Sequence, residues 1–225
     1  LVMKYGSDRI IPVDSEHSAI FQALLAGKLS DVKRLILTAS GGPFRDRSDL
    51  SNVSVADALN HPTWSMGEVV TINSATLLNK GLEIIEAHYL FGLAYENIEA
   101  VIHPQSVVHS LVEFIDGSTI AQASPPNMKG PIAYALAYPE RVNKACAPID
   151  WSKNHNWQFL PIDHEKYPAI ALAKIAAVLI YFISPFDFIP DVLPIIGFTD
   201  DLALVLWVGK SIKNELDEFE KHVNV

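Results

Sequence analysis

The sequence predicts an α/β (α+β) protein, a mixed sheet with flanking helices, followed by a small C-terminal helical hairpin module. Short apolar runs that are typical of buried strands alternate with longer stretches of helical periodicity. Two of these runs are joined by Asp116-Gly117, a dipeptide that favours a tight hairpin turn. The chain has 225 residues, of which 49% are hydrophobic and 19% charged, so it is long and apolar enough to form a core.

The chain is expected to begin as an α/β unit. Residues 10–13 and 34–38 have the composition of short buried strands on either side of a helix over residues 18–26. Residues 41–67 are polar and contain only a short helical segment at 55–59. Connections of this length are usually functional lids or disordered segments.

A long helix is expected next, over about residues 74–91, with Ser74 or Thr76 as its N-cap. The hairpin at Asp116-Gly117 then belongs to a group of strands in the second half of the chain. The remaining expected elements are strands over 99–102, 107–115 and 118–123 and two apolar helices over 171–182 and 202–219.

Charge and cysteine content restrict the class of protein. The chain has 17 basic and 26 acidic residues and a net charge of -9, which excludes a sequence-independent nucleic-acid surface as the expected function. A single cysteine, Cys146, cannot form an internal disulfide, which indicates a reducing, cytoplasmic environment. Residues 1–10 lack the basic and apolar pattern of a secretory signal, and a start at Leu1 suggests a cut chain.

Three carboxylates are the most informative chemical feature. Asp14 and Glu16 lie two residues apart in a segment expected to be extended, so their side chains would project from the same face. Glu83 lies three residues after Lys80, which places both on one face of the expected helix. Oxygen-only ligands favour Mg²⁺ or Mn²⁺ over zinc, while ordinary solvated acids at a strand end are the alternative. The spacing alone leaves both interpretations open; a cation site at this place would lie beside an ammonium that can bind an anionic group.

A second set of polar residues consists of Ser40, Ser74, Asn79 and Lys80. Hydroxyls, an amide and an ammonium can surround a phosphate, and Gly41-Gly42 would let the backbone approach it closely. Each feature also has a structural explanation: a helix cap for Ser74, a solvated helix face for Lys80 and a turn for the glycines. The residues alone leave both interpretations open.

Five longer motifs occur in order along the chain, and together they resemble the catalytic domain of the 1-deoxy-D-xylulose 5-phosphate reductoisomerase family over about residues 1–175. The motifs are PVDSEHSAIFQ from Pro12, LTASGGPFR from Leu37, HPTWSMG from His61, SATLLNKGLE from Ser74 and HPQSVVHS from His103. The resemblance implies an oxidoreductase of non-mevalonate (methylerythritol phosphate) isoprenoid biosynthesis. Such an enzyme converts 1-deoxy-D-xylulose 5-phosphate to 2-C-methyl-D-erythritol 4-phosphate with NADPH and Mg²⁺ or Mn²⁺, and acts as a homodimer.

The resemblance also implies roles for the polar side chains of these motifs. It assigns metal binding to Asp14, Glu16 and Glu83, and substrate and phosphate binding to Ser15, Glu16, Ser40, His61, Ser74, Asn79, Lys80, Glu83 and His109. It assigns catalysis and closure over the substrate to His61, Trp64, Met66 and Lys80, and contact with the nicotinamide cofactor to Met66 and Gly67. Asn73 departs from the aspartate that is usual in the family. No role is assigned to His17, His88, His103, His155, His164 and His222.

The resemblance does not extend to the cofactor domain, because no Gly-x-Gly-x-x-Gly turn occurs in the sequence and few residues precede Asp14. We therefore expect a truncated enzyme that is weakly active or inactive alone. The alternative is a non-catalytic interaction or membrane-peripheral module that carries a relic enzyme domain. The expected parts are a remnant of the cofactor domain (1–10), the catalytic domain (11–125), a linker to the family's C-terminal region (126–174) and a two-helix module (175–225).

The C-terminal module resembles a different, small bacterial family of uncharacterised function. The resemblance is carried by the run SPFDFIPD from Ser184, which fits a Ser-Pro-x-Asp-x-Ile-Pro-Asp pattern. Its longest uncharged stretch, residues 175–186, is shorter than the about 20 apolar residues that a membrane span needs. Peripheral membrane contact through residues 175–225, or packing against another protein, remains open. Turn and cap roles explain the acidic residues Asp187, Asp191, Asp200 and Asp201 more simply than a second cation site does.

Overall fold

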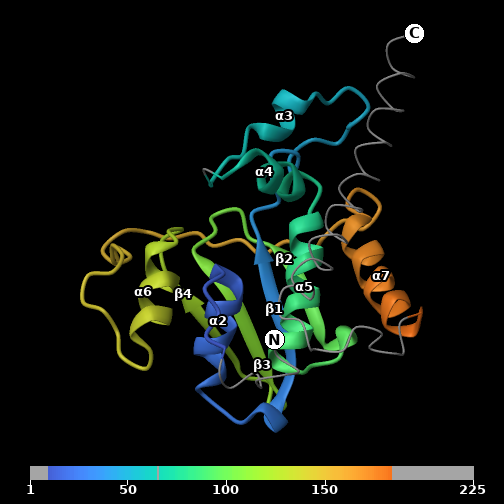
Figure 1. Cartoon of the computed structure of the whole chain (residues 1–225). Helices are drawn as coiled ribbons and strands as arrows, with labels where there is room; N and C mark the ends of the chain where they lie inside the picture. Colours follow the sequence, from blue (N-terminus) through green and yellow to red (C-terminus); the bar gives the residue numbers. More distant parts are fainter. Residues whose placement is uncertain (1–9, 65, 184–225) are drawn as a thin grey trace, which may run out of the picture. The chain divides into compact units, whose positions relative to one another are not determined.

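A computed structural model of the chain describes residues 10–64 and 66–183. These residues form one mixed sheet of four strands: β1 (Val32–Ala39), β2 (Ile98–Ile102), β3 (Val108–Phe114) and β4 (Thr119–Ala123). The strand order is β2-β1-β3-β4 (Figure 1). β1 pairs in parallel with β2 and antiparallel with β3, which pairs antiparallel with β4. The predicted fold class, a mixed sheet with flanking helices, is confirmed.

The parallel pair brings two polar segments together at one edge of the sheet. Ala39, at the end of β1, pairs with Ile102, at the end of β2. The backbone N–H of His103 then donates to the carbonyl oxygen of Ala39 at 2.7 Å. Because the carboxyl ends of parallel strands lie at the same edge of a sheet, Ser40 and His103, which directly follow these two strands, are close together in space.

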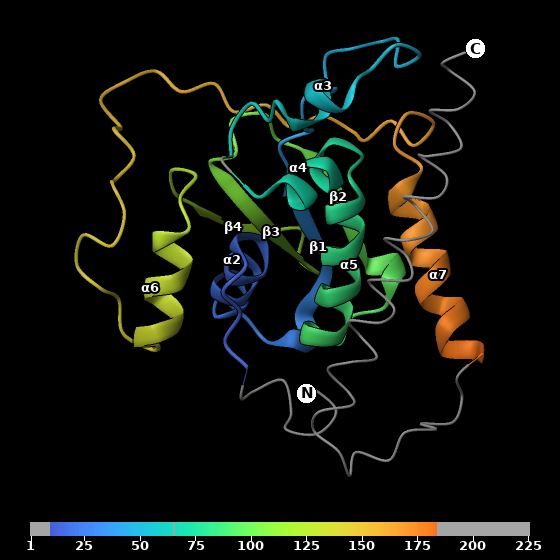
Figure 2. The ribbon, with the colours of Figure 1, turned by 45° about the horizontal axis from the view of Figure 1, so that its top comes forward.

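Helices α2 (Ser15–Leu24) and α5 (Leu78–Phe91) lie on the same face of the sheet and contact each other (Figure 1, Figure 2). α2 packs mainly on β3 and β4, while α5 packs on β1 and β2. Residues spaced three apart supply the apolar stripe of each helix: Ile20 and Ala23 in α2, Ile84 and Ala87 in α5 are all buried. The two helices that carry the candidate metal ligands are therefore neighbours.

Helix α7 (Ala169–Ile183) packs against α5 at a glycine. A Cβ atom built on Gly81 would lie 2.8 Å from the Cβ atom of Ala173 and 3.4 Å from the carbonyl oxygen of Ala169. The absence of a side chain at Gly81 lets the two backbones approach this closely. The other helical elements in the described part of the chain are α3 (Val55–Leu59), α4 (Glu68–Ala75), α6 (Lys129–Ala137) and the 3-10 turns η2 (Leu29–Asp31) and η3 (Tyr95–Asn97).

One apolar core joins segments that are far apart in the sequence. Buried residues of α2, the sheet and α5 pack with Ile162, Tyr167 and Ile170, which lie before and within α7. Tyr167 is only 2% exposed and is among the largest fully buried side chains. An aromatic side chain of this size contributes about 2–3 kcal/mol through burial. The segment that leads into α7 is therefore part of the same core as β1.

The strand predicted over residues 10–13 is wrong, because this segment is extended without pairing and leads into α2. Pro12 lacks the N–H group that a sheet ladder needs, and Asp14 caps the helix two residues later. α2 consequently begins at Ser15, three residues earlier than expected.

The single helix predicted over residues 74–91 is also wrong, since it is two helices, α4 and α5, separated at Leu77. Leu77 adopts a left-handed backbone conformation with φ 57°, which no continuous α-helix contains. Leu77, and neither Ser74 nor Thr76, is the N-cap of α5. Thr76 still contacts the start of that helix, because its Oγ1 accepts from the backbone N–H of Leu78 at 3.4 Å, while its hydroxyl lies 3.4 Å and 3.2 Å from the carbonyl oxygens of Ile72 and Asn73. Ser74 lies inside α4.

The other predicted elements agree with the structure. The short helix at 55–59 is α3, and the strands predicted around Asp116-Gly117 are β3 and β4, with Gly117 at φ 85° in the turn. The helix predicted over 171–182 is α7. The second predicted helix, over 202–219, lies outside the described residues. Within residues 10–64 and 66–183, the helices are all too short or too polar to cross a membrane.

Candidate metal and phosphate site

Asp14 is placed by its role as the N-cap of α2. Its Oδ1 atom accepts hydrogen bonds from the backbone N–H groups of Glu16 (3.0 Å) and His17 (3.1 Å). Aspartate is favoured at this position because its side chain satisfies N–H groups that have no partner within the helix. Glu16 lies in the first turn, where the helix dipole favours negative charge. The start of a helix, rather than the predicted extended segment, therefore brings Asp14 and Glu16 together.

Glu83 approaches the same point from α5. Lys80 precedes it by one helical turn and shares its face, as predicted: the ammonium of Lys80 contacts Glu83 Oε2 and lies 3.3 Å from Glu16 Oε1. Asn79 donates a hydrogen bond to Glu83 Oε1. Lys80 and Glu83 are only 4% and 5% exposed. An unpaired charge at this depth would be costly, so the cation and the carboxylates depend on each other.

Burial and charge pull the pKa values of this cluster apart. Burial, helped by the charges of Glu16 and Asp14, raises the pKa of Glu83 well above its ordinary value although Lys80 opposes this. Burial also disfavours charge on Glu16, but Lys80 and the hydroxyl of Ser15 outweigh it and lower the pKa of Glu16. For Lys80, the neighbouring glutamates outweigh burial and raise its pKa. Glu83 is thus the carboxylate whose negative charge the fold tolerates least.

The three carboxylates are close enough to bind one cation. One oxygen atom from each of Asp14, Glu16 and Glu83 lies within 4.8 Å of the others. Mg²⁺ and Mn²⁺ prefer oxygen ligands, and two oxygens on one such ion stand about 3–4 Å apart. The donor set therefore fits a divalent cation after small side-chain adjustments, with Lys80 supplying a nearby balancing charge.

His17 had no role assigned from the sequence, yet it lies behind the carboxylates and is only 2% exposed. Its Nε2 atom lies 2.8 Å from the carbonyl oxygen of Glu83. Its Nδ1 atom lies 3.3 Å from Asp14 Oδ1 and 3.5 Å from Glu86 Oε2. His17 thereby connects the start of α2 to the middle of α5. Its spacing of three from Asp14 could have indicated the contact with that aspartate, but no sequence pattern marks the contact with α5.

Ser40, His61 and Ser74 form a second polar group. His61 Nε2 lies 3.0 Å from Ser40 Oγ and 3.1 Å from Ser74 Oγ. His61 Nδ1 accepts hydrogen bonds from the backbone N–H groups of Thr63 and Trp64. Because Nδ1 is an acceptor, neutral His61 carries its proton on Nε2 and presents it to the two hydroxyls. Burial, with the nearby charge of Arg45, lowers the pKa of His61 and favours this neutral form.

Gly41 and Gly42 let the chain after β1 pass close to α4. Both adopt positive φ angles, 83° and 63°, which favour glycine. A Cβ atom on Gly42 would lie 2.8 Å from the carbonyl oxygen of Ser74. The backbone N–H of Gly42 also donates to Ser40 Oγ at 3.2 Å. The two glycines therefore let Ser40 and Ser74 approach each other closely enough for both hydroxyls to contact the imidazole of His61. The sequence predicted these two serines as parts of one phosphate site.

His109 and Trp64 lie near the carboxylate cluster. The rings of Trp64 and His109 have centroids 6.4 Å apart. Burial lowers the pKa of His109; the charge of Glu16 opposes this shift and that of Lys80 adds to it. The Nε2 atom of His109 lies 3.1 Å from both the carbonyl oxygen and the hydroxyl of Ser124.

The two residues predicted to contact the cofactor lie where α4 starts. Gly67 is the N-cap of α4, and the carbonyl oxygens of Met66 and Gly67 accept from the hydroxyl of Thr71. These contacts connect the residues after Trp64 to the helix that carries Ser74. The residues that make these contacts do not form a glycine-rich turn of the kind that binds a dinucleotide.

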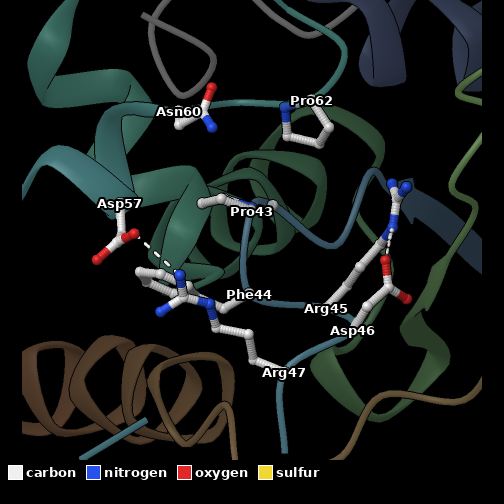
Figure 3. Close-up of a pocket in the computed structure, with 9 residues that line it drawn as sticks. Pro43, Phe44, Arg45, Asp46, Arg47, Asp57, Asn60 and Pro62 are labelled. Atoms are coloured by element: carbon white, nitrogen blue, oxygen red, sulfur yellow. Dashed lines mark hydrogen bonds and ion pairs between the residues drawn. The ribbon is translucent and has the colours of Figure 1, made fainter. Parts of the chain in front are cut away.

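A surface cleft of about 220 Å³ lies on the loop that follows β1 (Figure 3). Two ion pairs border it: Arg45 with Asp46 at 3.1 Å and Arg47 with Asp57 at 2.9 Å. Both guanidinium groups therefore already have carboxylate partners. The lining residues are Gly42, Pro43, Phe44, Arg45, Asp46, Arg47, Asp57, Asn60 and Pro62. The cleft is separate from the carboxylate cluster, which comes from α2 and α5.

Family models match most of the described chain. Residues 10–91 match the 1-deoxy-D-xylulose 5-phosphate reductoisomerase C-terminal domain, and residues 123–179 match the DXP reductoisomerase C-terminal domain. Residues 171–207 match a family described as a protein of unknown function (DUF1232). The last two matches overlap on α7.

Curated relatives agree with these matches. A 1-deoxy-D-xylulose 5-phosphate reductoisomerase of Streptomyces avermitilis is 60% identical over 168 residues, which is 74% of this chain and 43% of the relative. The enzyme of that name from Leifsonia xyli subsp. xyli is 61% identical over 172 residues, 76% of this chain and 48% of the relative. The chain thus spans a little under half the length of these relatives.

Solved structures give the same fold. A crystal structure of DOX-P reductoisomerase in complex with NADPH, fosmidomycin and magnesium matches with a TM-score of 0.72 and 47% identity, covering 80% of this chain and 48% of that one. A structure of DOX-P reductoisomerase in complex with magnesium matches with a TM-score of 0.70 and 44% identity, covering 80% and 47%.

Proposed function

The greater part of this chain belongs to the 1-deoxy-D-xylulose 5-phosphate reductoisomerase family, and we propose that it provides the metal- and substrate-binding half of that enzyme's active site. The observation that carries the proposal is the cluster of three carboxylates around Lys80, in which Lys80 and Glu83 are buried and Asp14 and Glu16 are partly exposed. Charged groups are rarely this deeply buried unless they bind one another or a cation. The substrate would be 1-deoxy-D-xylulose 5-phosphate, by analogy with the named relatives.

Asp14, Glu16 and Glu83 would hold Mg²⁺ or Mn²⁺, the former being present in the matched crystal structures. When bound, such an ion supplies Lewis acidity toward the oxygen atoms of the substrate. Lys80 keeps the glutamates oriented by contacting both of them, and Ser15 fixes Glu16 through a hydrogen bond of 2.6 Å to Oε2.

Ser40, Ser74 and His61 would bind the phosphate, with Asn79 and Lys80 at the start of α5 facing the rest of the substrate. Neutral His61 can turn its Nε2–H toward a phosphate oxygen in place of the two hydroxyls that it now contacts. The freed hydroxyls of Ser40 and Ser74 can then donate to the same group. His109, close to Glu16 and Trp64, would complete the substrate-binding side.

Trp64 and Met66 would cover the substrate and exclude water. Both residues are held through their backbone: the N–H of Trp64 donates to His61 Nδ1, and the carbonyl oxygen of Met66 accepts from the Thr71 hydroxyl. Hydride transfer from NADPH needs a nicotinamide site, and the described residues contain no dinucleotide-binding turn. The proposal for this chain is therefore limited to the metal and the phosphorylated substrate.

Binding experiments on the 225-residue chain test the proposal. Calorimetric titration should show Mn²⁺ binding and, in its presence, binding of 1-deoxy-D-xylulose 5-phosphate. Glu16→Gln should weaken both, because it removes a metal ligand, whereas Ser74→Ala should weaken only the phosphorylated ligand. 1-Deoxy-D-xylulose without its phosphate is the matched control ligand. A parent chain that binds Mn²⁺ but gives the same affinity with and without the phosphate would contradict the assignment of Ser40, His61 and Ser74.

A further inference from the structure

We infer that Lys166 is a positioning residue that holds the loop of residues 40–47 in the shape required for phosphate binding. The inference rests on the proposed function of Ser40 in that loop. Lys166 lies in the segment before α7, more than a hundred residues after the loop in sequence. It makes no contact with the carboxylate cluster among the described residues, and it belongs to none of the five motifs that predicted the site.

Lys166 binds the loop through backbone carbonyl groups. Its Nζ atom donates to the carbonyl oxygens of Phe44 (2.7 Å), Arg45 (3.1 Å) and Arg47. An ammonium has three donors, so every N–H of this group has a loop carbonyl as its partner. Hydrogen bonds from a charged donor are roughly twice as strong as those between neutral groups. The contacts do not depend on which side chains the loop carries, so they fix its backbone.

The lysine is itself fixed by its surroundings. Asp163 Oδ1 accepts from the backbone N–H groups of Glu165 (3.0 Å) and Lys166 (3.1 Å), and its carbonyl oxygen accepts from Tyr167 N–H (2.9 Å). Tyr167 is buried in the common core, and its hydroxyl donates to the carbonyl oxygen of Gly41 at 3.3 Å. Neighbouring residues 166 and 167 therefore contact both the start and the end of the loop, and Tyr167 is anchored in the core.

The shape of the loop determines where Ser40 lies. Arg45 Nη1 donates back to the carbonyl oxygen of Ser40 at 3.1 Å, so the backbone turns on itself between these residues. The side chains of Arg45 and Arg47 leave the loop in different directions (Figure 3), whereas the carbonyl oxygens of both residues accept from Lys166. Without Lys166, the carbonyl groups of Phe44, Arg45 and Arg47 would lose this donor. Ser40 would then lose its fixed distance to His61 and Ser74.

Two substitutions in the full 225-residue chain separate this role from general stability. Lys166→Met keeps much of the aliphatic length but removes all three donors, and Lys166→Arg restores charge and donors. Amide hydrogen exchange measured by mass spectrometry should be at least about tenfold faster over residues 40–50 in Lys166→Met, and unchanged over β3. Lys166→Arg should restore much of the protection. The affinity for 1-deoxy-D-xylulose 5-phosphate in Mn²⁺ should fall roughly tenfold in Lys166→Met, while the affinity for Mn²⁺ alone should stay within about twofold of the parent.

Each outcome decides the matter. Unchanged exchange over residues 40–50, or a uniform increase that includes β3, would overturn the inference. So would a local increase in Lys166→Met that leaves the affinity for the phosphorylated ligand unchanged. Failure of the proposed function would instead show in the parent chain, as absent binding of the phosphorylated ligand, whereas failure of the positioning role shows only in the comparison of parent and variant.

Discussion

Replacing Glu83 by glutamine should have opposite effects on stability with and without a divalent cation. In the metal-free protein, burial and the neighbouring carboxylates disfavour the charge on Glu83, and its pKa is raised above the ordinary value. A raised pKa means that the folded state binds this proton more tightly than the unfolded state. The fold therefore loses stability as the pH rises above about 4.5, the value of an unperturbed glutamate.

The size of the effect is bounded by the pH. At pH 7 such a shift costs at most about 3 kcal/mol, because the carboxyl simply stays protonated once its pKa exceeds the pH. Glutamine keeps one acceptor oxygen, for Lys80, and its NH2 group takes the place of the oxygen that accepts from Asn79, whose own amide must turn over to accept from it; Lys80 also retains Glu16 as its partner at 3.3 Å. We expect metal-free Glu83→Gln to be about 1 kcal/mol more stable than the parent, a rise in Tm of about 2–4 °C. The difference should disappear near pH 4.

With Mn²⁺ the order reverses. At a concentration a hundred times its Kd, the ion should stabilise the parent by about 2.7 kcal/mol. Removing one of three ligands should weaken binding by about a hundredfold or more, which reduces this gain in Glu83→Gln to about 0.4 kcal/mol. Glu140→Gln is the control, since it removes one charge at an exposed position outside α2 and α5.

Differential scanning calorimetry of the three proteins with and without Mn²⁺ measures both effects. Equal shifts by Mn²⁺ in the parent and in Glu83→Gln would refute the metal assignment. A metal-free Glu83→Gln protein that melts below the parent would refute the charge argument.

Three further predictions concern other parts of the molecule. The 225-residue chain alone should oxidise NADPH at no more than a trace rate with 1-deoxy-D-xylulose 5-phosphate, as followed by NADPH absorbance; turnover at an ordinary enzymic rate would contradict the proposed limits of its function. Gly81→Ala should destabilise the protein by about 1–2 kcal/mol in urea unfolding, because the new methyl would lie 2.8 Å from the Cβ of Ala173 and overpacking outweighs the about 1 kcal/mol gained in helix propensity. Adding Ala173→Gly should recover part of that loss, and no recovery would mean that the two positions do not touch. Burial lowers the pKa of His103, although its hydrogen bond to the Gln158 carbonyl opposes this, and neutral Nε2 accepts two backbone N–H groups. The contribution of His103 to stability is therefore present above about pH 6.5 and is lost as the pH falls through its lowered pKa. His103→Phe should cost about 2 kcal/mol in free energy of unfolding at pH 8 and should lack this acid-dependent loss.

The sequence predicted the elements whose pattern is local. The strands over 34–38 and 107–115 are short apolar runs with turn residues at their ends, and Asp116-Gly117 has the φ that a hairpin turn requires. The failures have causes that are not local. The break at Leu77 lies within an apolar pattern that continues across it, and Gly42 packs against the backbone there. The 10–13 segment has a strand-like composition but ends in a helix cap.

The site shows the same division. Asp14, Glu16 and Glu83 were predicted as a group because spacing and family motifs marked them, and their oxygens do converge. His17 and Lys166 were missed because their partners are 66 and up to 122 residues away, and a single histidine or lysine carries no distinguishing pattern. The roles of the predicted substrate residues and the domain boundaries stay predictions.

The position of β1 at the centre of the sheet has a consequence for the order of folding. Leu37 pairs with Ala100 on one side and Ser110 on the other, and both partners follow only after α3, α4 and α5. Pairings of such high sequence separation form slowly, typically in milliseconds to seconds. The carboxylates of α2 can meet Glu83 only after α5 has been synthesised, and α5 packs on β1 and β2, of which β2 follows it in the sequence. The cation site is therefore complete only once the long-range packing of α2 and α5 on the sheet has formed.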